Sequence, residues 1–488
     1  MCRKSVLVHF AGAVGWVPVV RTLPGRLRAI QSCDKQMTNS EITIEQNDMQ
    51  NARCLSLSTW LRDHVYLATV IVLIASLVPR LFLTLSADPQ QLWFRDSGTY
   101  LSNAYSLLER GAVLNSGQEP EVSRTPGYPV FLLAIMVATE KSLAPEDLGT
   151  VLVFQTVITS WSVVFLYWLA RRIVPPVMAF TGALLAAFSP WGAVTAGFAL
   201  TEGLHLLNLA LLFFVMYLVV EHATKLSAIL AGGALIGLLT SAAVFVRPIW
   251  PLVPLVAIAL FLLCGDKRKR AWILVAVMLV CAASPLYLWK ARNLREAQFD
   301  GLSNLSGVNV YLHLASSVKA QLKGAKGDRW AMREAAKEEE RQWSQGLSSQ
   351  EVNDERWRRA NAVFREYPIL TAYCFALNSA QHIFHPDPGI LRPAGLNFSG
   401  DFLVLGGCWA SLLIFAGLGL FGAPDRDRDG GIIKRKWLLA LLGICLLLAL
   451  PSGITFGNGS RLRAPLELIV PLLAAIGLVR LIRMWRQN

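Results

Sequence analysis

Long apolar runs separated by polar segments dominate the pattern of this 488-residue chain. A helix that crosses a bilayer needs about 20 mostly apolar residues. Runs that approach this length predict membrane-spanning helices at residues 64–85, 148–170, 177–195, 198–220, 226–246, 249–264, 271–289, 401–423, 437–456 and 464–482. The pattern thus predicts an all-α membrane protein, a polytopic helical bundle of about ten transmembrane helices. The segment VRPIWPLVP, residues 246–254, is also compatible with a proline kink inside one long element.

Clusters of Arg and Lys predict the orientation of these helices, because such clusters are enriched in cytosolic loops. The four densest clusters lie at residues 171–172, 266–270, 425–436 and 480–488. Alternation of ten spans puts all four on one side of the membrane, together with both termini. Two long segments, 86–147 and 290–400, then face the extracytosolic side. Long patterned loops are often functional, so we expect the chemistry there.

The domain organisation follows from these spans. We expect residues 1–62 to form a cytosolic, disordered segment, residues 63–482 to form the transmembrane domain with its two extracytosolic loops, and residues 483–488 to form a cytosolic tail. The start of the chain also has the basic residues and short apolar run of a weak signal peptide, without a convincing cleavage site.

Composition agrees with a membrane protein. Charged residues make up 16% of the chain, against about 25% in soluble domains. The formal net charge of +13 would suggest nucleic acid in a soluble protein, but here basic cytosolic loops explain it. We therefore expect no nucleic-acid partner. The eight cysteines are scattered without a C-x-x-C pair, so they indicate neither a disulfide framework nor a zinc site.

One carboxylate stands out beside the first span, in LWFRDSGTYLSNAYSLLERG, residues 92–111. The segment predicts an amphipathic helix that ends at Gly111. Asp96 stands at its start, where an N-cap role is the structural interpretation and a catalytic base is the functional one. The two are compatible, since a carboxylate oriented by helix N–H groups is well placed to accept a proton.

Three further residues lie near predicted membrane boundaries. SRTPGYP, residues 123–129, contains Arg124 and Tyr128, which are able to bind a phosphate or a sugar but are also typical interfacial anchors. Glu202 begins a predicted span, where a lipid-facing carboxylate would be costly. We expect it to face the protein interior, either in a site or as a partner of the helix dipole.

Basic residues recur at the extracytosolic ends of several spans, where few are expected. The group comprises Arg247, Lys290, Arg292 with the adjacent Asn293, Arg461 and Arg463. Each arginine alone would be explained by snorkelling, but together they predict an anion site, because the planar guanidinium makes bidentate contacts with phosphate.

Metal-ligand signals are weak. HIFHPDPG provides His382, His385 and Asp387, but no fourth ligand is defined, and interfacial residues before a Pro-rich turn explain the segment equally well. We therefore predict no protein-defined metal site.

These motifs together resemble the integral-membrane glycosyltransferases of the GT-C class, in particular the bacterial branch related to protein O-mannosyltransferases and the lipid A aminoarabinose transferase. The resemblance rests on their order along residues 64–482, from RDSGTYLSNAYSLLERG and RTPGYPVFLLA through FALTEGLHLL, VFVRPIWPL and PLYLWKARN to RLRAPLELIVPLLAAIGL.

The resemblance implies a polyprenyl-phosphate sugar as donor, transfer with inversion to a hydroxyl of a glycolipid, glycan or protein, and a site at the outer face of a bacterial inner membrane. Asp96 corresponds to the catalytic base of the family. Many relatives carry a second acid directly after it, where this chain has Ser97. A bound divalent cation is therefore left open.

The sequence leaves three alternatives. A lipid-linked oligosaccharide ligase or polymerase would use a pyrophosphate donor. A secondary transporter would place its polar residues near the bilayer midplane, often in repeated halves, and a non-catalytic assembly scaffold would use Asp96 for partner binding only.

Overall fold

The computed structural model describes residues 57–485 except for 88–95, 116, 142–144, 250, 266, 325–326, 386–400, 422–432 and 458. The chain divides into two units, Met1–Thr59 and Trp60–Asn488. Almost all of the first unit, and with it most of the predicted segment 1–62, lies outside the described residues. The described part of the second unit contains helices and one isolated β-bridge, between Leu114 and Pro120.

Helices long and apolar enough to cross a membrane confirm the predicted fold class. Within the described residues there are eight: α2 (Val65–Ser86), α5 (Pro145–Ile173), α8 (Thr201–His222), α9 (Leu226–Val246), α11 (Arg268–Ala297), α17 (Asp401–Phe421), α18 (Arg435–Ala449, continued by the 3-10 turn η4, Leu450–Ile454) and α19 (Leu466–Trp485). The chain is therefore a multi-pass helical membrane protein.

The predicted number of ten spans is not confirmed. Residues 177–195 form two helices, α6 (Pro176–Ala187) and α7 (Pro190–Gly197), bent by 53°. The bend lies where Ser189 caps α7 and Pro190 cannot continue the preceding helix. Residues 249–264 form α10 (Leu252–Cys264), whose 13 residues extend only about 20 Å. The described chain thus has eight spans, or nine if the bent pair counts as one.

Glycine contacts allow close packing in the bundle. Helix α9 packs along α11, and α17 packs along α19. A Cβ atom at Gly237 would collide with the backbone of α11 at Met278, and one at Gly477 would collide with the backbone of α17 at Phe415. Small residues at helix contacts let membrane helices pack closely, so these glycines set the spacing of the two pairs.

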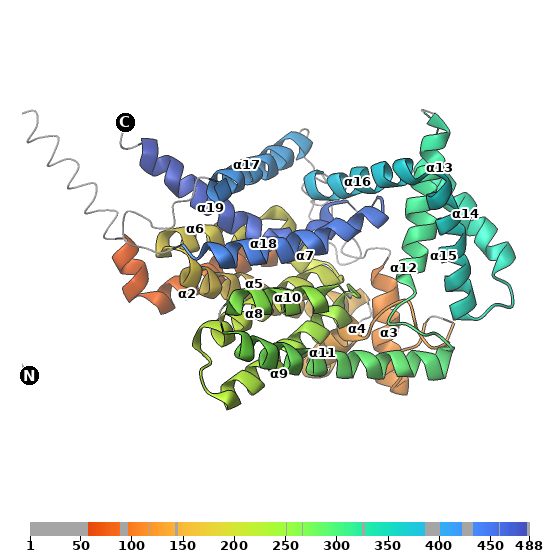
Figure 1. Ribbon diagram of the computed structural model, residues 1–488, viewed down its shortest axis with the longest axis horizontal. Helices are drawn as coiled ribbons and strands as arrows, with labels where there is room; N and C mark the ends of the chain where they lie inside the picture. The colour runs from red at the N-terminus through yellow and green to blue at the C-terminus, as the bar shows by residue number, and fades with distance from the viewer. Residues whose placement is uncertain are drawn as a thin grey trace, which may run out of the picture. The chain divides into compact units, whose positions relative to one another are not determined.

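The two long predicted loops fold into helices. The first contains α3 (Ser97–Arg110) and α4 (Gly127–Thr139). The second contains α12 (Leu305–Val308), the π-helical turn η1 (Asn309–Ala315), α13 (Ser316–Leu322), α14 (Arg329–Trp343), α15 (Ser349–Glu366) and α16 (Pro368–Phe384). Figure 1 shows α12 to α15 together at the end of this unit where α3 also lies. They enclose a small core that includes Val310, Tyr311 and Ala360.

Candidate active site

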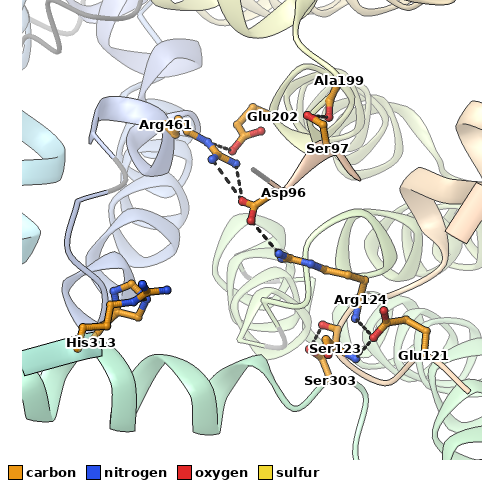
Figure 2. Close-up of polar contacts among 11 residues, drawn as sticks. Asp96, Ser97, Glu121, Ser123, Arg124, Ala199, Glu202, Ser303, His313 and Arg461 are labelled. Atoms are coloured by element: carbon orange, nitrogen blue, oxygen red, sulfur yellow. Dashed lines mark hydrogen bonds and ion pairs between the residues drawn. The ribbon is translucent and has the colours of Figure 1, made fainter. Parts of the chain in front are cut away.

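Asp96 lies directly before α3, as predicted, but it does not cap the helix. Its side chain makes no capping hydrogen bond, while Gly111, with φ of 66°, ends the helix as expected. The carboxylate instead accepts a hydrogen bond from Arg124 at 3.0 Å on Oδ1 and from Arg461 at 3.3 Å on Oδ2. Asp96 thus has the N-cap position without the side-chain hydrogen bond that the structural interpretation expected, and two guanidinium groups orient its carboxylate (Figure 2).

Arg124 comes from the segment before α4. Its backbone N–H donates to Glu121 Oε1 at 3.3 Å, and its guanidinium carbon lies 5.1 Å from the centre of the Tyr100 ring. Tyr100 is a buried residue of α3. The cation–π contact and the backbone contact together fix the side chain, so that it points at Asp96 from the first long segment.

Arg461 comes from the opposite end of the sequence, in the 3-10 turn η5 (Gly459–Arg463). Besides contacting Asp96, its Nε donates to Glu202 Oε1 at 3.0 Å. The same oxygen lies 3.8 Å from Arg247 at the end of α9. Only 1% of the Glu202 side chain is exposed. This buried carboxylate contacts Arg461 and Arg247, and Arg461 in turn contacts the more exposed Asp96.

Asp96, Arg124, Glu202, Arg247 and Arg461 form one charged cluster. Asp96 is its most accessible member, with 35% of its side chain exposed. Burial raises the pKa of Asp96, but the charges and hydrogen bonds of Arg124 and Arg461 outweigh burial and place that pKa below its ordinary value. Burial lowers the pKa of Arg461, but the negative charges of Glu202 and Asp96 outweigh it and raise that pKa. Asp96 and Arg461 are therefore charged at neutral pH, and Asp96 in this state is a weak base.

A divalent cation does not fit the cluster well. The guanidinium of Arg461 already bridges Asp96 and Glu202, and therefore supplies the positive charge that a bridging cation would supply. Ser97, at the position of the second acid in many relatives, is buried and donates to the Ala199 carbonyl at 2.9 Å. Among the described residues, no group of three His, Cys, Asp or Glu side chains is placed to bind a metal ion.

One buried residue near the cluster was missed by the sequence analysis. His205 follows Glu202 by one turn of α8 and is fully buried. The Ala243 carbonyl faces its ring, yet neither ring nitrogen makes a hydrogen bond of normal geometry, and Glu202 Oε2 also has no partner among the described residues. Glu202 and His205 are three residues apart, which places them on one helix face. This spacing could have predicted from the sequence that they lie together.

Tyr128 is placed in the protein core and not at the surface. Its ring has no exposure, and its hydroxyl donates to Gln155 Oε1 at 2.6 Å. The ring meets Tyr100 edge to face, with centroids 5.1 Å apart. Interfacial anchoring is therefore wrong for this residue, and a substrate contact would require its hydroxyl to leave Gln155.

Arg292 and Asn293 serve the packing of the first long segment and do not join the cluster. Arg292 donates to the carbonyls of Val113 and Glu121, both at 2.8 Å, and forms an ion pair with Glu296 at 2.6 Å. Asn293 is buried and donates to the Gly301 carbonyl at 2.8 Å. These contacts use the donors that were predicted to bind phosphate.

Arg463 is fully buried, two residues after Arg461. Its guanidinium carbon lies 4.0 Å from the ring centres of both Trp191 and Trp409, and its Nε forms an ion pair with Glu467 at 3.1 Å. A guanidinium enclosed in this way cannot reach a ligand at Asp96. The predicted phosphate role is therefore wrong for Arg463 in this structure.

The remaining polar candidates lie elsewhere. Lys290 pairs with the exposed Asp300 at 2.9 Å. His382 is buried and its Nε2 lies 3.1 Å from the Thr455 carbonyl, whereas His385 is exposed and Asp387 lies outside the described residues.

Of the predicted arginines, the structure brings Arg124, Arg461 and Arg247 to the two carboxylates, Asp96 and Glu202.

Comparison with known proteins bears on the fold. No family model and no curated protein matches the sequence. The oligosaccharyltransferase of Archaeoglobus fulgidus, tethered to an acceptor peptide containing the NVT sequon, matches with a TM-score of 0.52 at 14% identity, over 87% of this chain and 50% of that chain. Its apo form gives 0.50 at 13% identity, over 86% and 51%.

ArnT from Cupriavidus metallidurans, bound to undecaprenyl phosphate, matches with a TM-score of 0.39 at 16% identity, over 84% of this chain and 78% of that chain. The chain spans about half the length of the oligosaccharyltransferase structures that it matches. At these identities the likeness concerns the fold. The chain therefore shares the helical membrane fold of the two oligosaccharyltransferase structures, as expected from the GT-C resemblance of its motifs.

Proposed function

We propose that this protein is a membrane glycosyltransferase that moves a sugar from a polyprenyl-phosphate donor to a hydroxyl-type acceptor, with Asp96 as the base. The observation that carries the proposal is the carboxylate of Asp96 between Arg124 and Arg461, partly exposed and supported by buried Glu202. On this proposal Asp96 is the proton acceptor, and Arg124 and Arg461 bind the phosphate of the donor. The GT-C fold supports the same reaction class.

The reaction requires both kinds of group. The acceptor oxygen forms a bond to the anomeric carbon of the sugar while its proton passes to Asp96. The bond between that carbon and the phosphate oxygen breaks, and the electron pair leaves with the polyprenyl phosphate. Attack opposite the leaving group inverts the configuration. A general base typically contributes about 10²–10⁴ in rate, and a donor aimed at developing charge contributes about 10²–10³.

The contacts of Asp96 with the two arginines imply how it becomes a base. With both guanidinium groups bound, its pKa lies below the ordinary value, which is unfavourable for accepting a proton. A donor phosphate competes for the same N–H groups and adds negative charge nearby, and both effects raise a carboxyl pKa. Donor binding thus prepares Asp96 for proton transfer.

The location of the charged cluster at the ends of membrane spans suits a lipid-linked donor. Glu202 and Arg247 lie at the ends of the spans α8 and α9, so a prenyl chain can remain in the bilayer while its head group reaches the cluster. We propose that this end of the bundle faces the outside of a bacterial inner membrane, because basic residues that favour the cytosol lie at the other end of α19. The acceptor is then a glycolipid, glycan or protein on that side.

The test uses purified wild-type protein in proteoliposomes with radiolabelled polyprenyl-monophosphate and polyprenyl-diphosphate sugars, and acceptors drawn from cell-envelope extracts. We expect covalent transfer from the monophosphate donor. Transfer from the diphosphate donor alone would favour a ligase or polymerase. Flux of a solute without any covalent product would favour a transporter, and the absence of both would contradict an enzymatic function.

A further inference from the structure

The helix α16 has its polar side inside and its apolar side outside. Its buried residues are Cys374, Asn378, Ser379 and His382. Its exposed side carries Ile369, Tyr373 and Phe384, which retain 86%, 54% and 60% of their exposure. A helix on the surface of a soluble domain shows the opposite arrangement. The inverted pattern needs an apolar environment around the helix.

The buried side of α16 docks on the end of a membrane span. Ser379 donates to the Leu450 carbonyl at 3.1 Å, and Asn378 donates to the Gly453 carbonyl at 3.1 Å. Both carbonyls belong to η4, the last turns of the span that begins with α18. The last carbonyls of a helix lack partners within it, so α16 supplies these hydrogen bonds and is fixed at the depth where the span ends.

The sequence of α16 agrees with that depth. Its 17 residues, Pro368–Phe384, include no Asp, Glu, Lys or Arg, whereas the preceding α15 is rich in charge. Tyr367 and Tyr373 lie near its first turns, and tyrosine is enriched at the boundary between lipid and water. The span itself also exposes apolar residues near this end, Leu447 and Leu450.

We propose that α16 lies in the lipid leaflet at the active-site end of the bundle, with the face formed by Ile369, Tyr373 and Phe384 against the acyl chains. The occupant of this face is bilayer lipid and not a second protein, because α16 docks on a membrane span that also exposes apolar residues near the same end. On the proposed orientation the leaflet is the outer one. Part of the segment predicted as an extracytosolic loop would therefore be immersed in the membrane and attach the helices α13 to α15 to it.

Footprinting of the unmodified chain in lipid nanodiscs tests this placement. A lipid-soluble photoreactive diazirine should label Ile369, Tyr373 and Phe384 as it labels Tyr287, which is 69% exposed on the span α11. Hydroxyl radicals generated in water should oxidise Trp330, which is 47% exposed on α14, and leave Tyr373 unmodified. Oxidation of Tyr373 together with absence of diazirine label on α16 would overturn the proposal.

Spin labels provide a second measurement that does not depend on enzymatic activity. In a cysteine-depleted chain, a label at Ile369→Cys should collide more with oxygen than with a water-soluble nickel chelate. A label at Leu347→Cys, a position 40% exposed between α14 and α15, should show the reverse. Equal behaviour of the two labels would contradict the proposal even if the proposed transferase activity is confirmed, and the expected difference would support it even if that activity fails.

Discussion

Arg461 donates from its Nε to Glu202 Oε1 at 3.0 Å, across 259 positions of sequence. This ion pair joins the turn η5, near the C-terminal span, to the first turn of α8. Because the other two nitrogens of the same guanidinium contact Asp96, the pair sets the position of the exposed carboxylate. The position of Asp96 therefore depends on the buried contact between Arg461 and Glu202.

Replacement of Arg461 by lysine should reduce transfer strongly. A lysine ammonium preserves the charge but cannot contact Glu202 and Asp96 with separate, rigidly spaced donors. We expect kcat/KM to fall by about 10²–10³, measured with a polyprenyl-phosphate sugar in proteoliposomes. The matched control is Arg341→Lys, on an arginine 77% exposed on α14, which should retain wild-type activity. Equal activities of the two variants would remove Arg461 from the site.

Replacement of Glu202 by glutamine should destabilise the protein. The side chain is 1% exposed and faces Arg461 and Arg247, so the change removes a buried negative charge that both arginines face. Loss of one partner of a buried pair typically costs about 3–5 kcal/mol. Denaturant titration in detergent should show this loss. The control Glu338→Gln, at a residue 60% exposed, should change stability by less than about 0.5 kcal/mol, and a similarly small change for Glu202→Gln would contradict the buried network.

The lowered pKa of Asp96 predicts the direction of a pH effect. A carboxyl whose pKa is lower in the folded than in the unfolded protein adds stability above its unfolded pKa, near 3.9 for Asp, and this contribution is lost as the pH falls through the folded pKa. The wild type should therefore lose stability below about pH 4 more steeply than Asp96→Asn. Thermal unfolding midpoints between pH 6 and 3 measure the difference; parallel curves would show that the arginines do not lower this pKa.

Replacement of Arg292 by alanine should loosen the segment between α3 and α4. Arg292 holds the carbonyls of Val113 and Glu121, so its loss exposes this segment to protease. Limited proteolysis with mass spectrometry should show new cleavage between residues 111 and 123. The neighbouring Lys290→Ala, which removes only a surface ion pair, should show no new cleavage. An Arg292→Ala variant with intact proteolytic resistance but lost donor binding would restore the phosphate role predicted from sequence.

The sequence predicted the membrane depth of the arginines better than their direction. Apolar runs locate the ends of spans, and Arg247, Arg292, Arg461 and Arg463 all occur near such ends. Their direction around the bundle depends on packing partners that are distant in sequence. Trp191 and Trp409 enclose Arg463, whereas Glu202 draws Arg461 towards Asp96, and nothing local in RLR distinguishes the two.

The number of spans was also predicted only in part from the sequence. Hydropathy predicts an apolar run over 249–264, but the prolines before it and Gly265 after it leave only Leu252–Cys264 helical. Hydropathy also cannot show that Ser189 and Pro190 divide the run 177–195 into two helices with different directions. The start of α3 was predicted correctly, yet the cap role of Asp96 was not, because two distant arginines compete with the local backbone for its carboxylate.

The most direct measurement compares Asp96→Asn with Asp300→Asn in proteoliposomes that contain a radiolabelled polyprenyl-phosphate sugar and its acceptor. Asp300 is a matched control because it is 56% exposed and forms a surface pair with Lys290. We expect Asp300→Asn to transfer sugar like the wild type, and Asp96→Asn to lose about 10²–10⁴ in kcat while it remains folded. Transfer by Asp96→Asn at the wild-type rate would contradict the role of Asp96 as the base.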